Sequence, residues 1–281
     1  MRKSSTTQRR KQLVSIMVVG ILILVLAVAG IGIHIISKYI PSKEQMNLTE
    51  YYGQPAEGEM VLVLGTDIME ERALKSGDQI YLPQDIVSTY LNQRYYWDSG
   101  NQQILYATPS SLEKFPASEA GDGEVWVRDG KVYLSLSFVQ KYTDLDFYEY
   151  QEPARVVIRH EFTGVNVATV KKDTSIRYRG GIKSPVLTEV KKGDTLIYMQ
   201  ALEDWVQVST MDGYIGYVQK KVLSDMETTD FERDFEKEDY TYLTMEDKVN
   251  MTWHQITNTD ANAYLGDMTA NVSGLNVISP T

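Results

Sequence analysis

The side chains in this sequence with the clearest chemical potential are clustered aromatics. Tyr95, Tyr96 and Trp97 are consecutive and are followed by Asp98. Aromatic faces stack on the C–H groups of sugar rings, so this motif is a candidate sugar-binding platform. The motif recurs as an aromatic-rich stretch at residues 147–150. We therefore favour the simpler interpretation, in which these rings form core and cross-strand pairs.

Metal and cofactor chemistry is not indicated by the sequence. The chain has no cysteine and three histidines, whereas copper sites take several imidazoles or thiolates in one place. His160 stands beside Glu161 with no second imidazole nearby, and we predict a surface pair. We expect no metal, no cofactor and no disulfide. The lack of cysteine suits the exterior of a Gram-positive bacterium.

The charge of the chain limits its partners. There are 28 Lys and Arg against 38 Asp and Glu, which gives a net charge of −10. Such an acidic protein does not bind nucleic acid or anionic surfaces by charge, so partners must be held by short-range contacts.

An apolar run near the N-terminus predicts a membrane anchor. Residues 13–36 contain no charged side chain, and basic residues without acids precede them. About 20 apolar helical residues cross a bilayer, and the basic side stays in the cytoplasm. We therefore predict a transmembrane helix over residues 13–37, with His34 at the outer interface and the bulk of the chain extracellular. The alternative is a secretory signal cleaved near Ala29.

The next part of the chain contains an internal repeat. Residues 78–106 and 130–158 align without a gap, and each predicts a strand, a short helix and two further strands. This pattern indicates an α+β domain with two similar halves. The stretch YLPQDIVSTYLNQRYYWDSGNQQILYA resembles the copper amine oxidase N-terminal-like domain of Gram-positive exported proteins, over residues 60–161. Despite the family name, the resemblance implies no copper.

A second set of short strands follows at residues 162–224. Ile176-Arg177, the Gly180-Gly181 turn, residues 190–194 and residues 213–218 occur in an order that resembles a bacterial SH3-like domain. The resemblance implies a small β-barrel with an aromatic groove that docks peptides or cell-wall stems. We assign four residues to this wall-ligand groove: Tyr178, Trp205, Tyr214 and Tyr217. Alternatively, Trp205 and Tyr217 only plug the barrel.

Two polar segments are predicted as linkers. Residues 38–59 contain scattered Pro and Gly and predict a tether. Residues 225–247 are strongly acidic and predict a solvated linker. A calcium loop is excluded there, because that loop needs a glycine and the segment has none.

The last segment, residues 248–281, predicts a strand, a helix and a second strand, which is a βαβ unit. It resembles the opening of the (β/α)8 barrel in glycoside hydrolase family 18 proteins of Firmicutes, where an anchor, a repeat domain and an SH3-like module precede the barrel. A TIM barrel needs about 250 residues, so we expect an incomplete barrel and a fragment of a longer protein. Trp253 and His254, at the outgoing end of the first strand, are assigned to the lining of a sugar cleft.

No catalytic residue can be assigned. The family resemblance implies an acid Glu in the motif Asp-x-x-Asp-x-Asp-x-Glu, and the nearest match, at residues 144–149, has its Glu one residue too far. In a strand, that shift turns the carboxylate to the opposite face.

These observations predict a multi-domain chain with one transmembrane helix, an α+β repeat domain, an SH3-like β-barrel and the first βαβ unit of a TIM barrel. The expected function is a membrane-anchored, extracellular targeting arm of a family 18 enzyme that acts on N-acetylhexosamine polymers, chitin or peptidoglycan glycan. The arm itself is expected to be inactive. The alternative is a non-catalytic cell-wall-binding or stalk protein. The expected partners are the membrane, through a single span, and cell-wall glycan or peptide, with no nucleic acid.

Overall fold

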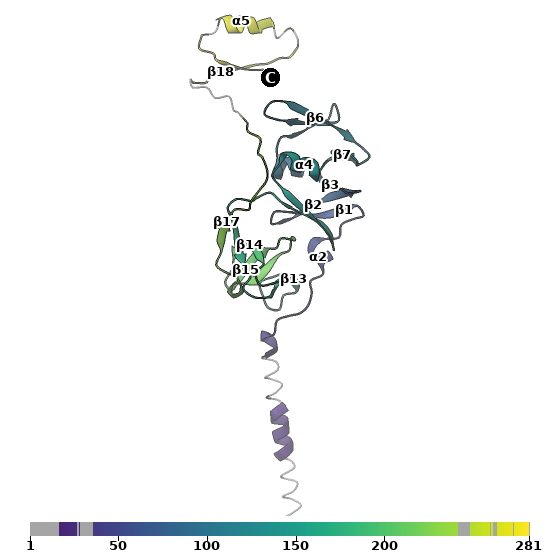
Figure 1. Cartoon of the computed structure of the whole chain (residues 1–281), viewed down its shortest axis with the longest axis vertical. Helices are drawn as coiled ribbons and strands as arrows, with labels where there is room; N and C mark the ends of the chain where they lie inside the picture. Colours follow the sequence, from purple (N-terminus) through teal and green to yellow (C-terminus); the bar gives the residue numbers. More distant parts are fainter. Residues whose placement is uncertain are drawn as a thin grey trace, which may run out of the picture. The chain divides into compact units, whose positions relative to one another are not determined.

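The computed structural model describes residues 17–26, 28, 36–240, 248–258, 260, 263–271 and 273–280. The chain divides into two compact units, Met1–Lys237 and Glu238–Thr281. Most of the described structure is β-sheet, and the helices between the strands are short (Figure 1).

The first unit contains a ten-stranded and a seven-stranded sheet. The strands of the ten-stranded sheet are β1 Glu59–Leu64, β2 Asp67–Ser76, β3 Gln79–Pro83, β4 Tyr95–Asp98, β5 Gln103–Ala107, β6 Leu112–Ser118, β7 Val125–Arg128, β8 Lys131–Ser135, β9 Asp146–Gln151 and β10 Ala154–Arg159. Those of the seven-stranded sheet are β11 Val165–Thr169, β12 Thr174–Arg177, β13 Val186–Val190, β14 Thr195–Ala201, β15 Trp205–Ser209, β16 Ile215–Gln219 and β17 Glu227–Thr229. The short helices of this unit are α2 Leu48–Tyr52, α3 Gln84–Ile86, the π-helix η1 Val87–Leu91, α4 Leu136–Tyr142 and the 3-10 helix η2 Lys220–Val222.

The predicted membrane anchor is not supported. In the part of the chain that the structure describes, no helix is both long and apolar enough to cross a membrane. The predicted fold class with its transmembrane helix over residues 13–37, and the localisation as a single-pass protein of the cell membrane, are therefore wrong. His34, Ala29 and several neighbours in that segment lie outside the described residues.

The ten-stranded sheet is organised around the repeat. Its strand order is β4-β5-β6-β7-β8-β3-β2-β1-β10-β9, which is symmetric about the antiparallel β3–β8 pair. In sequence order, each half of the repeat contributes five strands, β1–β5 and β6–β10. A short helix follows the third strand of each half, α3 with η1 in the first and α4 in the second. The symmetry is broken by strand direction, because β6 pairs parallel with β7 whereas β1 pairs antiparallel with β2.

Strands β1 and β10 are buried on both faces. Met60, Leu62 and Leu64 belong to the core of the ten-stranded sheet, whereas Val61 and Val63 belong to a second core with the seven-stranded sheet. Alternate residues of a strand point to opposite faces. The unbroken apolar run of β1 is therefore explained by two cores that share this strand, and the two sheets form one unit.

The segment predicted as a tether is instead packed against the seven-stranded sheet. The amide of Met46 donates to the carbonyl of Val186 at 2.7 Å, the amide of Val186 donates to Glu44 at 2.7 Å, and the amide of Ser42 donates to Ile182 at 2.8 Å. We call residues 40–46 the strap. Two of its hydrogen bonds pair with Val186, the first residue of the edge strand β13, whose backbone groups would otherwise be unpaired there.

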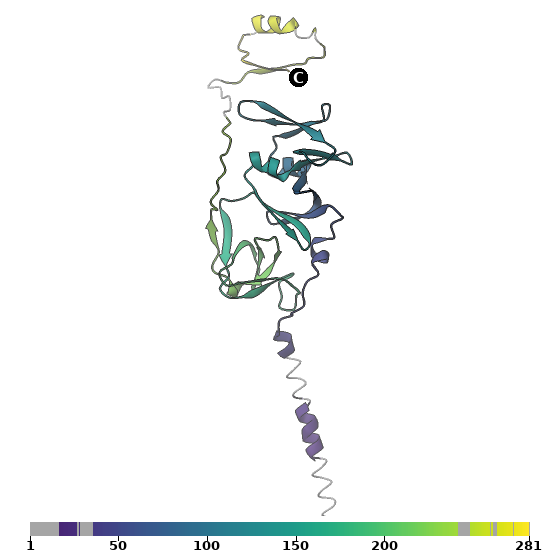
Figure 2. The same cartoon turned by 45° about the vertical axis from the view of Figure 1, so that its right-hand side comes forward.

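The seven-stranded sheet has the order β13-β12-β16-β15-β14-β11-β17. Its last strand comes from the segment predicted as an acidic linker, because β17 pairs with β11 through Val165 and Thr229. The sheet therefore extends beyond the predicted boundary at residue 224. Figure 2, turned by 45° from Figure 1, shows α2 beside the seven-stranded sheet, whose core also contains Tyr52 of this helix.

The second unit is a parallel strand pair with one helix. It contains β18 Met251–His254, α5 Tyr264–Asn271 and β19 Val277–Pro280, and Met251 pairs with Val277. Large apolar side chains of this unit are exposed, among them Trp253 and Tyr264. This connectivity is the βαβ arrangement predicted for residues 248–281.

We expect hydrogen exchange to be fastest, among the described strands, in β18 and β19. A two-stranded pair with exposed apolar residues has little buried area to resist local opening. Mass-spectrometric exchange on the full chain would measure this, with β1 as the protected reference. Equal protection in β18 and β1 would contradict the expectation.

Candidate binding grooves

Two of the four predicted groove residues line one groove. Tyr178, just after β12, and Tyr217, in β16, both line a groove of about 440 Å³ on the seven-stranded sheet. They are neighbours because Arg177 pairs with Tyr217 across the two strands. Tyr51 of α2 also lines this groove, which we call the tyrosine groove.

Tyr51 was not assigned to this groove from the sequence, because it lies in the N-terminal segment predicted as a tether, far in sequence from Tyr178 and Tyr217. Its hydroxyl donates to the carbonyl of Ile215 at 2.7 Å and accepts from the amide of Ile215 at 2.9 Å. Its ring meets that of Tyr178 edge-on, with centroids 6.1 Å apart. Burial raises the pKa of Tyr51 to about 12, and the two hydrogen bonds with Ile215 hold the ring in place.

The tyrosine groove combines apolar and polar walls. Besides the three rings it is lined by Thr66, Asp67, Ile68, Arg179, Met199, Gln207 and Ile215. Its two charged residues, Asp67 and Arg179, have opposite signs, and the guanidinium of Arg179 lies 5.2 Å from the ring centroid of Tyr178. Flat aromatic surfaces next to hydrogen-bonding groups, with little net charge, suit an uncharged polar polymer.

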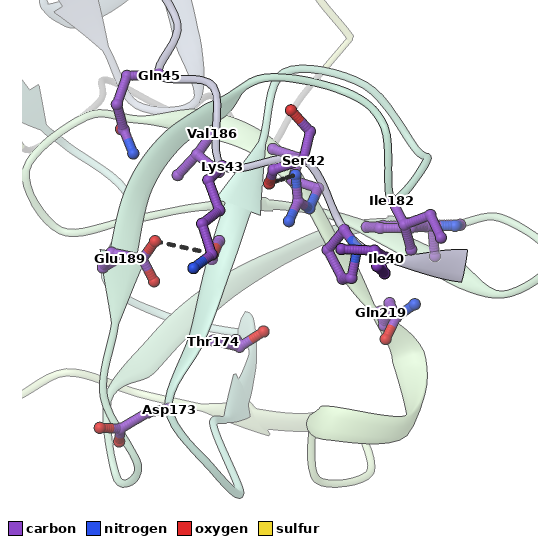
Figure 3. Close-up of a pocket in the computed structure, with 14 residues that line it drawn as sticks. Ile40, Ser42, Lys43, Gln45, Asp173, Thr174, Ile182, Val186, Glu189 and Gln219 are labelled. Atoms are coloured by element: carbon purple, nitrogen blue, oxygen red, sulfur yellow. Dashed lines mark hydrogen bonds between the residues drawn. The ribbon is translucent and has the colours of Figure 1, made fainter. Parts of the chain in front are cut away.

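Trp205 lines a different cavity. This cavity of about 580 Å³ lies between the strap and the seven-stranded sheet, and it shares no lining residue with the tyrosine groove. Figure 3 shows Ile40, Ser42 and Lys43 of the strap running along the strands that carry Thr174 and Glu189. We call it the indole cavity.

The strap is fixed across the indole cavity. Arg177 is buried, and its Nη1 donates to the carbonyls of Ser42 at 3.0 Å and Ser184 at 2.6 Å. Gly180 lies against the Trp205 ring, since a Cβ added there would be 3.4 Å from Cγ of the indole. The indole is therefore held between the Gly180 loop and a cavity that the chain's own strap covers.

Tyr214 is not a groove residue. It is buried in the core that the two sheets share, where its ring packs against Tyr52 with centroids 5.8 Å apart. The guanidinium of Arg155 lies 5.0 Å from the Tyr214 centroid. The assignment of Tyr214 to the wall-ligand groove is wrong, because the ten-stranded sheet covers this side of the seven-stranded sheet.

The two predicted cleft residues of the second unit do not act together. Trp253 and His254 are adjacent in β18, so their side chains point to opposite faces. Trp253 is exposed, whereas His254 is buried and its Nε2 has no hydrogen-bond partner within the described residues.

The segment that best matches the family 18 catalytic motif, residues 144–149, contains two aspartates that are paired with an arginine. Arg233 donates from Nε to Asp144 at 2.8 Å and from Nη1 to Asp146. Among the residues the structure describes, no group of three or more His, Asp or Glu side chains is placed to hold a metal ion.

His160 was predicted to form an exposed pair with Glu161, and the structure does not place it at the surface. It is partly buried, and burial lowers its pKa.

Comparison of the whole chain with protein-family models, curated proteins and solved structures finds no match.

Proposed function

We propose that this chain is a non-catalytic arm that binds N-acetylhexosamine polymers of the bacterial cell wall through the tyrosine groove. The proposal follows from one observation, which is that Tyr51, Tyr178 and Tyr217 come from three separate segments and line one groove. A role as the targeting arm of a family 18 glycoside hydrolase rests on the sequence resemblance alone and is a prediction about a longer protein.

The chemistry of the groove supports a glycan ligand. Tyrosine faces pack on sugar C–H groups, while Thr66, Gln207 and the Asp67 and Arg179 side chains offer hydrogen bonds to hydroxyl and acetamido groups. An opening along the sheet surface admits a polymer, whereas a closed pocket would admit only its end.

The pairing of Asp144 and Asp146 with Arg233 favours binding over hydrolysis at these two residues. Glycosidases that use two carboxylates need one acid and one base or nucleophile on either side of the bond. Asp144 and Asp146 are both paired with Arg233, so this pair is not available for that chemistry.

Replacing Tyr217 with Ala is expected to weaken the affinity of the full chain for purified peptidoglycan, measured by sedimentation, by about two- to tenfold. The physical reason is the loss of one stacking ring, worth about 0.5–1.5 kcal/mol beyond its buried area. The measurement is the bound fraction against peptidoglycan concentration. Because the contacts are short-range, raising the salt to about 0.5 M should leave the parent's binding unchanged or stronger.

Trp205→Ala is the matched aromatic control, since Trp205 lines the indole cavity. We expect this variant to sediment like the parent, and Tyr96→Ala, which removes an exposed ring of the ten-stranded sheet, to do the same. If folded Tyr217→Ala binds as well as the parent, the tyrosine groove is not the binding site. If only Trp205→Ala loses binding, the indole cavity is the binding site.

A further inference from the structure

The indole cavity contains a buried cation that has no acidic partner. Two arginines are buried within the described part of the chain, Arg155 at 3% and Arg177 at 7% exposure. Arg155 has a carboxylate oxygen of Asp212 at 4.0 Å, whereas none of the ion pairs between described residues includes Arg177. A buried charge without a counter-ion is costly. An anionic ligand at Arg177 would remove this cost.

The strand register places Arg177 on the same face of the sheet as Trp205. Arg177 of β12 pairs with Tyr217 of β16. Gln219 lies two residues further along β16 and pairs with Trp205 of β15. Paired residues, and residues two apart in one strand, lie on the same face, while the neighbouring Ile176 points to the opposite face and belongs to the core. The Arg177 side chain therefore faces the indole cavity, which it lines together with Trp205.

The guanidinium of Arg177 has hydrogen-bond donors that the fold does not use. It carries five N–H donors in a planar fork. The two hydrogens of Nη1 are donated to the carbonyls of Ser42 and Ser184, and Nε and Nη2 have no hydrogen-bond partner among the described residues. The buried side-chain atoms without a partner in that part of the chain belong to His160 and His254, so Nε and Nη2 of Arg177 reach accessible space. These two nitrogens form the edge that holds a carboxylate through two parallel hydrogen bonds.

The other charges of the cavity limit the ligand to one negative charge. Asp173 pairs with Lys191 at 3.4 Å, and Figure 3 shows the Lys43 side chain extending from the strap toward Glu189. Burial lowers the pKa of Arg177, and the charge of Glu189 offsets this only in part, although the guanidinium remains protonated at neutral pH. One carboxylate would complete the pairing of Arg177, whereas a doubly charged anion would be repelled by Glu189 and Asp173.

The rest of the lining is suited to an apolar body. The volume of about 580 Å³ lies within the range of about 300–1,000 Å³ that small-molecule sites occupy. Gln45 and Gln219 add amide groups to the wall, and these hydrogen-bond to a peptide-like group. The apolar residues of the lining are Ile40, Pro41, Ile182, Val186 and Trp205.

We propose that the indole cavity binds a small monocarboxylate with an apolar body, such as an N-acylated apolar amino acid. Nε and Nη2 of Arg177 hold the carboxylate, and the apolar body packs against Trp205. The cavity shares no lining residue with the tyrosine groove, so this proposal does not rest on glycan binding there.

The test is a titration of the full chain with N-acetylvaline, followed in ¹H–¹⁵N spectra by the Nε–H resonance of Arg177 and the indole N–H resonance of Trp205. Both resonances should shift and saturate together. N-acetylvalinamide has the same body without the charge and should bind at least about tenfold more weakly, because a charge-assisted pair is lost. Acetate, which lacks the apolar body, should also bind about tenfold more weakly, as should inorganic phosphate with its additional charge.

Three variants test the residues of the site. Arg177→Lys keeps the charge but lacks the two-nitrogen edge and should weaken N-acetylvaline binding by about tenfold or more. Arg128→Lys is the same substitution at an exposed arginine of the ten-stranded sheet and should leave binding unchanged. Ser175 lies two residues before Arg177 and lines the cavity, so Ser175→Trp should abolish binding by filling it. This variant retains the Arg177 side chain and therefore keeps the test decisive if Arg177→Lys loosens the strap.

Several results would overturn the proposal. They are equal binding of N-acetylvalinamide, an Arg177 resonance that N-acetylvaline does not shift, and unchanged affinity in folded Arg177→Lys or Ser175→Trp. Equal binding of acetate would overturn the apolar body, and equal binding of phosphate would overturn the single charge.

A peptide end carries the same chemical group as N-acetylvaline. N-acetyl-Gly-Gly-Val distinguishes the two sources, because tighter binding than that of N-acetylvaline assigns the cavity to a peptide end and weaker binding assigns it to a free small acid. Either result supports a monocarboxylate site.

The outcome is independent of the peptidoglycan assay. Saturating N-acetylvaline should leave the sedimentation of the parent with peptidoglycan unchanged, and Tyr217→Ala should still bind N-acetylvaline. Each proposal therefore fails or stands by its own variant.

Discussion

Replacing Arg155 with Ala is expected to lower the free energy of unfolding of the first unit by about 3–4 kcal/mol. Arg155 is almost fully buried, with 3% of its side chain exposed. Its guanidinium lies 4.5 Å from the ring centroid of Tyr150, 5.0 Å from that of Tyr214 and 5.4 Å from that of Tyr52. Each cation–π contact of a desolvated cation contributes about 1–2 kcal/mol.

The hydrogen bonds of Arg155 add to this effect. Its Nε donates to the carbonyl of Asp212 at 3.2 Å, and its Nη1 donates to the carbonyls of Glu152 at 3.0 Å and Pro153 at 3.4 Å. Asp212 belongs to the seven-stranded sheet's β15–β16 connection and Arg155 to β10. The alanine variant would leave these carbonyls without their charged donor and would open a space between the two sheets.

Unfolding in urea, followed by Tyr and Trp fluorescence, measures the change. Because Arg155 joins the two sheets, we also expect the variant to unfold in two transitions where the parent shows one. Arg128→Ala is the matched control, since the Arg128 side chain is 43% exposed, and it should change the free energy by no more than about 0.5 kcal/mol. Equal midpoints for the two variants would show that Arg155 does not hold the sheets together.

Gly216→Ala is expected to destabilise the seven-stranded sheet by about 3 kcal/mol. A Cβ at this position would lie 2.6 Å from the carbonyl oxygen of Arg177, 2.7 Å from Cγ2 of Ile176 and 2.7 Å from Cδ1 of Leu187. The first of these atoms belongs to the backbone of the paired strand β12, which cannot move without breaking the sheet. Overpacking of this kind costs about 1–3 kcal/mol or more.

Gly181→Ala is the control for this variant. No atom lies within 4 Å of a Cβ added at Gly181, so we expect no loss of stability and a small gain through the unfolded chain. Thermal unfolding of both variants beside the parent measures the difference. A Gly216→Ala protein as stable as Gly181→Ala would mean that β12 and β16 are not packed as closely as described.

The groove residues were predicted only in part from the sequence. Tyr178 and Tyr217 were assigned to one groove from the resemblance to an SH3-like domain, and in the structure they are neighbours because β12 and β16 pair at Arg177 and Tyr217. Tyr51 was missed, since no local signal connects a residue of the N-terminal segment with β16. Trp205 was assigned to the same groove, but the Gly180 loop and the strap leave it lining a separate cavity.

His160 was predicted in a surface pair for a similar reason. A lone histidine beside a glutamate is usually solvated. In the structure, residues 231–233 return across the first unit and line a cavity together with His160, and the Nδ1 atom of His160 is buried. The sequence of the predicted acidic linker does not indicate that Arg233 is docked. Arg233 is held by Phe162, Asp144 and Asp146, which lie in a distant segment of the chain.

The sequence alone determined the repeat and the strand, helix and strand of the last segment. These features depend on apolar spacing and on glycine or polar residues between strands, which are properties of near neighbours. Tertiary structure alone decided that Val61 and Val63 face a second core, that Tyr214 is buried beside Arg155, and that residues 40–46 are docked. Whether the second face of a strand is buried depends on which distant part of the chain covers it. The local sequence pattern of apolar residues is the same whether that face is covered or not.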